Sequence, residues 1–239
     1  AAAARQQGIC LNEQTLEITK QVVQDLPSLK FVISIDGKTD LPGILCLSSF
    51  QKEDPGKFRP VDSSDDDISS IMYTSGTTGP PKGVMVTHRS YVCCGQGYTH
   101  WAAITDRDRL FTCLPLYHAN AQYYSAMGSL AAGASLILAN GFSASGFWDQ
   151  IRQYDATVFN FIGAMVVILM KQSETPLDGL NKVRVAYGTP ALDKALQDRF
   201  EERFGITVLA GYALTECPFG TIQPLQGIEI EYRRKLFRG

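Results

Sequence analysis

The sequence lacks any run of about 18 apolar residues and any leader in which basic residues precede an apolar stretch. Those two patterns mark membrane-spanning helices and secretory signals, so we expect neither a membrane span nor export. An excess of positive charge is also absent, because 22 basic residues stand against 24 acidic ones. This balance argues against nucleic acid or an anionic membrane surface as a partner bound by bulk electrostatics.

Metal-binding and redox spacings of cysteine are missing as well. The six cysteines form no C-x-x-C pattern, and the three histidines add no zinc-like spacing. Several of the thiols lie in apolar stretches, where a thiol behaves as a small hydrophobic group. We therefore predict a reducing compartment, the cytoplasm.

Length and composition allow a substantial core, since 239 residues are 45% hydrophobic. From about residue 133 onward, short β-branched or aromatic runs alternate with helical patterns, which predicts βαβ units, a mainly parallel sheet and the α/β class. Residues 62–67 are acidic and polar, and they are the predicted linker. The predicted strands are an isolated one at 31–35, then 68–73, 109–114, 135–139, 157–162, 183–187 and 206–209.

Helices are predicted from apolar periodicity and from capping residues. The last of them carries Leu192, Leu196, Phe200 and Phe204 on one face, and Gly205 ends it. The other predicted helices are 89–103, 121–132, 147–154 with Ser143 or Ser145 as its cap, and 164–171.

Residues 73–83 read Tyr-Thr-Ser-Gly-Thr-Thr-Gly-Pro-Pro-Lys-Gly, a loop dense in glycine and hydroxyl groups. Glycines let main-chain N–H groups approach an anion closely, hydroxyls add donors, and Lys82 adds a mobile positive charge. We predict that this loop binds phosphates and joins a strand to a helix. The glycines are Gly76, Gly79 and Gly83, and the hydroxyls belong to Thr74, Ser75, Thr77 and Thr78.

Two other interpretations of this loop are weaker. The P-loop pattern GxxxxGK[ST] needs a Gly before the Lys, whereas Lys82 lies between Pro81 and Gly83. A plain Ser/Thr/Gly linker is rarely flanked by strand-like runs on both sides. The segment resembles the signature Y-T-S-G-T-T-G-x-P-K-G of AMP-binding, adenylate-forming enzymes, and every fixed position matches.

Residues 211–216, Gly-Tyr-Ala-Leu-Thr-Glu, follow the last predicted strand, where open parallel sheets bind ligands. Taken alone, a Tyr and a Glu after a strand are more often a packed ring and a solvated carboxylate. The adenylate-forming family carries Y-G-x-T-E here. The resemblance implies that Tyr212 lies against adenine, Thr215 contacts the α-phosphate and Glu216 binds Mg²⁺, while Ala213 replaces the usual Gly.

Residues 187–190, Tyr-Gly-Thr-Pro, taken alone form a turn with Pro190 at the first helical position. The family carries a Gly-Gly-Ala-Pro-like segment there that lines the adenine and acyl sites. Gly188 and Pro190 match that segment, and Thr189 does not. The resemblance therefore adds Gly188, Thr189 and Pro190 to the nucleotide site.

Residues 114–118, Leu-Pro-Leu-Tyr-His, follow another predicted strand. A lone His is more often structural, but this run resembles acyl- and aryl-CoA ligases, in which the His lies near the carboxylate. Amino-acid-activating relatives place an Asp nearby, and residues 112–145 contain none, so an amino acid would lack its counter-ion. We expect residues 118–122 and 161–165 to line the acyl pocket. Segments 114–122 and 147–150 most resemble carnitine- or crotonobetaine-type CoA ligases.

The resemblance spans roughly residues 29–222 and lacks both an R-T-G-D-like segment and a lid domain with its lysine. We therefore expect a fragment of a large N-terminal domain, inactive on its own. The expected divisions are a partial N-terminal subdomain portion with linker (1–61), an AMP-binding core (62–226), and a truncated or discontinuous tail (227–239).

The resemblance implies ATP-dependent conversion of a carboxylic acid into an acyl-adenylate, followed by transfer to CoA, with ATP, Mg²⁺ and CoA required. Two alternatives stay open, a non-catalytic nucleotide-binding module and a luciferase-like adenylating oxidoreductase. The partners expected are small molecules, and neither the acid nor the oligomeric state follows from the sequence. The expected catalytic residues are Thr74, Lys82, His118, Thr215 and Glu216.

Overall fold

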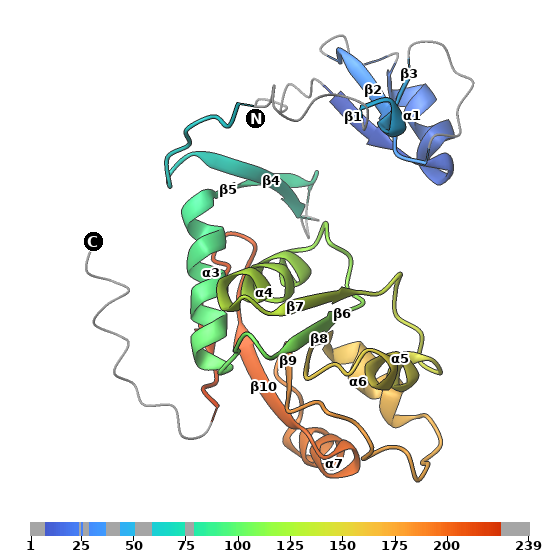
Figure 1. The fold of residues 1–239 in the computed structure, drawn as a ribbon, viewed down its shortest axis with the longest axis vertical. Coiled ribbons are helices and arrows are strands. Elements are labelled where there is room, and N and C mark those ends of the chain that lie inside the picture. The colour runs from blue at the N-terminus through green and yellow to red at the C-terminus, as the bar shows by residue number, and fades with distance from the viewer. Residues whose placement is uncertain are drawn as a thin grey trace. The chain divides into compact units, whose positions relative to one another are not determined.

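The computed structural model describes residues 8–23, 25, 29–36, 44–50, 59–74 and 79–225, and the chain divides into two compact units, residues 1–62 and 63–239 (Figure 1). In the smaller unit, strand β2 is the centre of a parallel sheet of order β1-β2-β3. The strand predicted from the isolated signal at 31–35 is confirmed as β2, whereas its partners β1 and β3 were not predicted. The elements of this unit are β1 (Gly8–Leu11), η1 (Glu13–Thr15), α1 (Leu16–Val23), β2 (Phe31–Ser34), β3 (Ile44–Cys46) and α2 (Leu47–Phe50).

The larger unit is built on a six-stranded sheet of order β11-β10-β9-β8-β6-β7. Only the short edge strand β11 is antiparallel, which confirms the predicted α/β class with a mainly parallel sheet. The strands are β6 (Arg109–Thr112), β7 (Ser135–Leu138), β8 (Val158–Ile162), β9 (Val185–Thr189), β10 (Thr207–Tyr212) and β11 (Thr221–Ile222).

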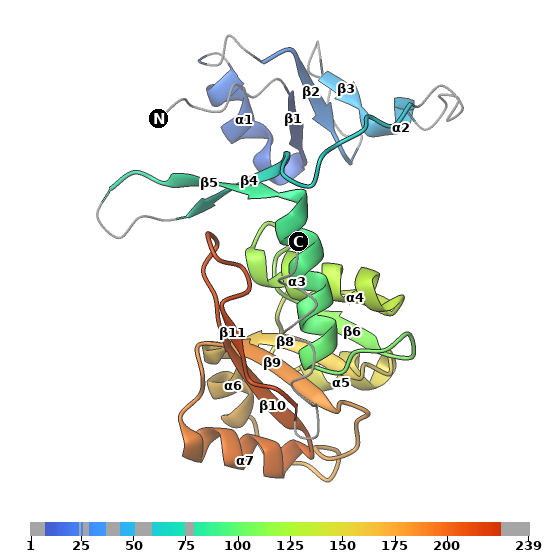
Figure 2. The same ribbon diagram turned by 90° about the vertical axis from the view of Figure 1, so that its left-hand side faces the viewer.

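Helices cover both faces of this sheet (Figures 1 and 2). Parallel strands covered on both faces carry continuous apolar runs, and neighbouring residues of one strand pack into different cores. Val158 of β8, for example, packs with α3, whereas Phe159 packs with α5, α6 and α7. The helices are α3 (His88–Trp101), α4 (Met127–Ala132), α5 (Phe147–Gln153), α6 (Gly163–Met170) and α7 (Lys194–Phe204).

Helix α3 crosses α4 very closely, and a glycine permits it. A Cβ atom at Gly95 would lie 2.5 Å from the backbone oxygen of Met127. The predicted helix at 89–103 therefore forms in spite of its glycines, because close packing outweighs their poor helix propensity. Within the described residues, no helix has the length and apolar character needed to cross a bilayer.

Gly95→Ala should destabilise the larger unit by about 1–3 kcal/mol, because the added methyl group meets a backbone atom that cannot rotate away. Urea unfolding followed by tryptophan fluorescence measures this, since both tryptophans, Trp101 and Trp148, lie in this unit. Gly179→Ala is the matched control, because a Cβ there meets nothing within 4 Å. Equal stability of the two variants would contradict the close crossing.

Several boundaries differ from those predicted. The predicted helix 121–132 begins as a π-helical turn, η3 (Ala121–Ala126), before α4. The strand predicted at 183–187 is shifted by two residues, so Gly188 and Thr189 lie inside β9, and Pro190 precedes α7 by several residues instead of starting it. Helix α5 begins after Gly146 without a side-chain cap, although the Ser143 hydroxyl accepts a bond from the Gly146 N–H at 3.3 Å.

Most of the stripe on α7 is confirmed, since Phe200 and Phe204 are buried, Leu196 packs against the same core, and Gly205 ends the helix with φ at 66°. Leu192 also packs there, but it lies before the helix begins at Lys194. Two thiols also behave as predicted for small hydrophobic groups. Burial raises the pKa of Cys94 to about 12 and that of Cys113 to about 11, so both stay protonated.

Candidate functional site

The glycine- and hydroxyl-rich segment lies at the end of a β-hairpin. Strands β4 (Ile68–Thr74) and β5 (Lys82–Thr87) are antiparallel, and Thr74 pairs with Lys82. The prediction that the loop joins a strand to a helix was wrong, because residues 82–87 continue the ladder before α3 begins. Alternating side chains such as Val84 and Val86 favour that ladder over an immediate helix.

Most residues of the hairpin next to the connecting loop are exposed to solvent. Lys82 and Gly79 are exposed, and the Thr74 hydroxyl donates to the Lys82 carbonyl oxygen at 3.5 Å. A Cβ at Gly79 would meet nothing within 4 Å, so the backbone there is open to an incoming anion. The remaining predicted loop residues lie outside the described residues, namely Ser75, Gly76, Thr77 and Thr78.

Thr215 and Glu216 are the central residues of a tight turn between β10 and β11. The turn is closed by reciprocal bonds, from the Leu214 N–H to the Cys217 oxygen at 3.0 Å and from the Cys217 N–H to the Leu214 oxygen at 3.1 Å. Glu216 is exposed and Thr215 is half-buried. The turn therefore places an exposed carboxylate and a half-buried hydroxyl on adjacent residues, after the carboxyl end of β10.

The β10–β11 loop is anchored against the helices. The Tyr124 hydroxyl donates to the Pro218 oxygen at 2.6 Å, and a Cβ at Gly97 would lie 2.7 Å from the Phe219 ring. Burial raises the pKa of Tyr124, so the phenol stays neutral and remains a donor. Ala213 does not have the positive φ that would require glycine, so the replacement of the family's Gly is sterically acceptable.

Gly188, Thr189 and Pro190 continue this edge at the end of β9. Gly188 pairs with Ala210 of β10, and Thr189 pairs with Ile162 of β8. A Cβ at Gly188 would lie 2.3 Å from the Phe161 ring, so only glycine fits here without a shift of that buried ring.

His118 follows β6 on an exposed turn. The backbone N–H of His118 donates to the Pro115 carbonyl oxygen at 3.0 Å, and its ring Nδ1 accepts the backbone N–H of Asn120 at 3.3 Å. An Nδ1 that accepts carries no proton, so the neutral ring is protonated at Nε2 and can donate outward. His100 packs edge-on against Trp101, with 4.8 Å between ring centroids.

Buried amides behind His118 were missed from the sequence. Asn160 is 1% exposed, accepts from the Tyr98 hydroxyl at 3.1 Å, and donates to the Asn120 side-chain oxygen at 2.9 Å. The available signal was a single Asn inside the apolar strand 158–162. This chain of bonds holds the backbone that contacts His118 Nδ1.

The predicted groups gather at one end of the larger unit. His118, the end of β9, Tyr212 and the Thr215–Glu216 turn all follow carboxyl ends of sheet strands, where open α/β sheets bind ligands. The β4–β5 hairpin lies beyond that same end of the sheet in both views (Figures 1 and 2). Tyr212 is 63% exposed, which leaves its ring available to stack on a ligand.

An apolar cavity of about 630 Å³ also opens at the carboxyl ends of β6, β7 and β8. From the segment 161–165, which we expected to line an acyl pocket, Ile162, Ala164 and Met165 line this cavity. Phe161 is instead buried in the core, and residues 118–122 do not line this cavity. Its other walls come from 113–116, 138–142 and Ile168.

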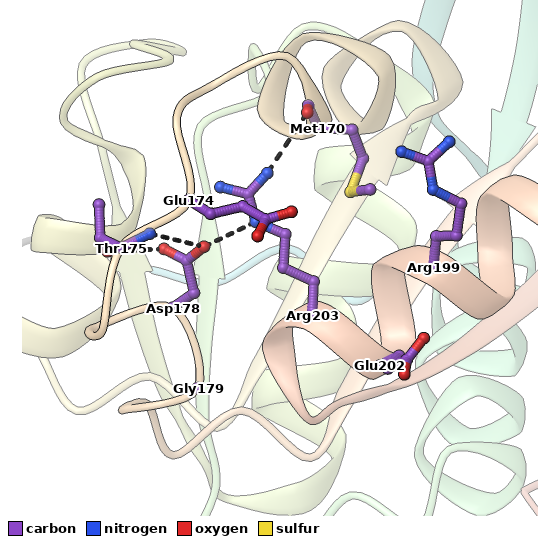
Figure 3. Close-up of a pocket in the computed structure, with 8 residues that line it drawn as sticks. All are labelled: Met170, Glu174, Thr175, Asp178, Gly179, Arg199, Glu202 and Arg203. Carbon is purple, nitrogen blue, oxygen red and sulfur yellow. Dashed lines mark hydrogen bonds and ion pairs between the residues drawn. The ribbon is translucent and has the colours of Figure 1, made fainter.

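A second, polar cavity of about 440 Å³ is lined by the end of α6, by the connection that follows it and by α7 (Figure 3). Its most buried cation, Arg203, donates to Asp178 at 2.6 Å, to the Met170 oxygen at 3.3 Å and to the Ser173 oxygen at 3.0 Å. Burial opposes ionisation of Asp178, but the bonds from Arg203 and Thr175 outweigh it and lower its pKa. These charges hold the α6–α7 connection together, and none of the predicted site residues lies here.

The family model for AMP-binding enzymes matches residues 7–234. The chain belongs to the AMP-binding enzyme family. A curated relative in this family, the crotonobetaine/carnitine–CoA ligase of Salmonella typhi, is 39% identical over 160 residues, which are 66% of this chain and 31% of the relative. The chain thus spans about a third of the length of the curated relatives it matches.

Solved structures of AMP-binding enzymes share the fold. The anthranilate CoA ligase AuaEII in complex with anthranoyl-AMP matches with a TM-score of 0.82 at 23% identity, covering 89% of this chain and 42% of that one. A red-emitting luciferase from Phrixothrix hirtus matches with a TM-score of 0.73 at 26% identity, covering 90% and 43%. Fold likeness alone therefore does not choose between a ligase and a luciferase.

Proposed function

We propose that this chain supplies the nucleotide- and carboxylate-binding part of an acyl-CoA synthetase. The enzyme would join a carboxylic acid to the adenylate of ATP and then transfer the acyl group to CoA. The observation that carries the proposal is the complete 73–83 signature, whose ends pair as Thr74 with Lys82 in the β4–β5 hairpin, in a chain of the AMP-binding enzyme family. The named CoA ligases among its relatives support it.

In the first step a carboxylate oxygen attacks the α-phosphorus of ATP, and the bond from that phosphorus to pyrophosphate breaks. CoA thiol then attacks the acyl carbon and AMP leaves. The protein's contribution is positioning and charge neutralisation, because no covalent bond to it is needed. We assign the phosphates to Thr74, Ser75, Gly76, Thr77, Thr78, Gly79, Lys82 and Thr215, and the adenine to Gly188, Thr189, Pro190 and Tyr212.

Mg²⁺ would bind at Glu216. Mg²⁺ keeps most of its waters and usually takes only one or two carboxylates plus phosphate oxygens, and an exposed carboxylate at the corner of a turn fits that requirement. The ion would neutralise charge on the phosphates. Thr215, the adjacent residue, would place its hydroxyl on the α-phosphate.

His118 would face the carboxylate, with its Nε2–H as the donor. Crotonobetaine is the first acid to test, because a relative that is 39% identical is named for it. The cytoplasm is the proposed compartment, in keeping with buried, protonated thiols at Cys94 and Cys113.

A luciferase-like oxidation is a second candidate, favoured by the structural likeness to the Phrixothrix enzyme. Both functions begin with adenylation, so the second step separates them. Thioester formation with CoA supports the synthetase, whereas light emission or oxygen uptake with the adenylate supports the luciferase. ATP binding without either product would indicate a non-catalytic nucleotide-binding module.

Lys82→Ala should weaken binding of Mg-ATP about tenfold, because one charge-assisted contact to phosphate is lost. Isothermal titration calorimetry of the chain measures this, and the exposed position of Lys82 makes loss of folding an implausible cause. The matched control is Lys171→Ala, an exposed lysine after α6 on which we place no ligand. An unchanged affinity would remove Lys82 from the phosphate site.

A further inference from the structure

Tyr91 of α3 connects the β4–β5 hairpin to η3. Its hydroxyl lies 2.9 Å from the Ser70 hydroxyl of β4 and donates to the side-chain oxygen of Gln122. Its ring meets the edge of the Tyr123 ring, with centroids 5.0 Å apart. Tyr91 is half-buried, so these bonds are partly shielded from water.

The side chain of Gln122 continues the connection to the turn that carries His118. Its Nε2 donates to the Leu116 oxygen, inside the segment 115–118 that is closed by the bond from the His118 N–H to Pro115. The Gln122 backbone N–H also donates to the His118 oxygen at 3.3 Å. Both the side chain and the backbone of Gln122 therefore hold this turn.

The three side-chain bonds all run in one direction. Tyr91 has a single hydroxyl proton, which it gives to Gln122, so the Ser70 hydroxyl must be the donor in the bond between them. The order is Ser70 to Tyr91, Tyr91 to Gln122, and Gln122 to the Leu116 oxygen. Hydrogen bonds aligned in this way polarise and strengthen one another.

The two ends of this series of hydrogen bonds belong to the two halves of the proposed site. Ser70 lies on β4, the strand that leads into the phosphate loop, and Leu116 lies two residues before His118. Gln122, in the middle of the series, lies on the π-helical turn η3, a rare geometry that is frequent at functional sites. A shift of β4 when phosphates bind would be transmitted to the His118 turn.

We propose that Gln122 is a positioning residue that couples the β4–β5 hairpin to the orientation of His118. This inference rests on the proposed function, in which the hairpin binds phosphates and His118 faces the carboxylate. The residue type suits the task, because a Gln side chain accepts from Tyr91 and donates to a backbone oxygen at once. Glu would accept but not donate, and Leu would do neither.

The coupling is measurable in the ligand-free chain by NMR of labelled histidine rings, with His118 assigned from a His118→Asn variant. Ser70→Ala and Tyr91→Phe should each shift the His118 ring signals when Gln122 is present. In a Gln122→Leu or Gln122→Glu background the same changes should leave those signals unmoved. Because Ser70→Ala and Tyr91→Phe are independent substitutions, one of them still tests the coupling if the other variant folds poorly.

Gln172→Leu is the matched control background, because the Gln172 side chain also donates to a backbone oxygen, that of Ile168 at 3.3 Å, and lies after α6, outside this chain of bonds. Ser70→Ala should still shift His118 in that background. Equal shifts with and without Gln122, or no shift with Gln122 present, would overturn the coupling.

In the protein that contains this chain, Gln122→Leu should weaken crotonobetaine binding about fivefold or more at saturating ATP and, because coupling is reciprocal, weaken ATP binding at saturating crotonobetaine by a similar factor. Each ligand bound without the other should keep its wild-type affinity, whereas a purely structural role would weaken binding of the single ligands as well or lower only the folded fraction. Failure of the wild-type chain to bind ATP would contradict the proposed function, whereas the ligand-free spectra decide the coupling independently.

Discussion

Glu216→Gln should lower carboxylate-dependent ATP–pyrophosphate exchange about 100-fold or more in the protein that contains this chain. The change keeps the shape of the side chain and removes the charge that we assign to Mg²⁺. Glu216 is exposed at the corner of a closed turn, so its replacement should leave the turn and the folded state intact. Crotonobetaine is the acid to use in the assay.

Glu202→Gln is the matched control for this experiment, since it makes the same chemical change at an exposed position on α7, at the polar cavity between α6 and α7. We expect it to retain the wild-type exchange rate. Thr215→Val should have a smaller effect than Glu216→Gln, because one neutral hydrogen bond is lost instead of a charge. An unchanged rate in Glu216→Gln would discard the metal assignment.

Asp108→Ala should destabilise the larger unit by about 3 kcal/mol, the largest stability effect that we predict for a polar residue. Asp108 is 5% exposed at the start of β6 and receives two bonds from Arg184, at 2.9 and 2.7 Å. The Thr157 hydroxyl donates to it at 2.7 Å, and the Thr105 N–H donates at 2.8 Å. Removing the carboxylate leaves all these donors without their acceptor.

Urea unfolding followed by tryptophan fluorescence measures the loss. Asp198→Ala is the matched control, because Asp198 pairs with Lys194 on the surface, where an ion pair contributes about 1 kcal/mol or less. Comparable losses in the two variants would show that the Asp108 network is not a main support of this unit.

The same network predicts acid sensitivity. Burial pushes the pKa of Asp108 upward, but the bonds from Arg184, Thr157 and Thr105 outweigh it and leave the pKa below its ordinary value. A carboxylate with a lowered folded-state pKa contributes stability above its unfolded pKa and loses that contribution as the pH falls through the folded value. Stability should therefore decline from about pH 4 downward, and Asp108→Asn should lose less on acidification than the wild type.

Much of the larger unit was predictable because its signals are local. Continuous apolar runs such as 158–162 indicate strands buried on both faces, and the spacing of Phe200 and Phe204 indicates one helix face. Gly205 marks the helix end because few other residues adopt its positive φ easily. The predicted boundaries at 183–187 failed because strand ends depend on pairing with β8 and β10.

The predicted site residues also come from local signals, namely short motifs next to strands. The contacts among them were not predicted, because each depends on partners distant in the sequence. Ser70 and Tyr91 are separated by 21 residues, and Tyr124 and Pro218 by 94. The hairpin of β4 and β5 was missed for another reason, since its two strands are close in the sequence but their pairing across the loop leaves no local pattern.

The sequence by itself determined the α/β class, the order of most strands and helices along the chain, and the match of residues 73–83 to the signature of AMP-binding enzymes, since all three follow from the periodicity and chemistry of adjacent residues. Only the tertiary structure decided that the signature ends a hairpin, that Thr215 and Glu216 share one tight turn, and that Gln122 connects Tyr91 to the His118 turn. The physical reason is that hydrogen bonds and close packing between elements depend on how the whole sheet and its helices pack, and no short stretch of sequence contains that information.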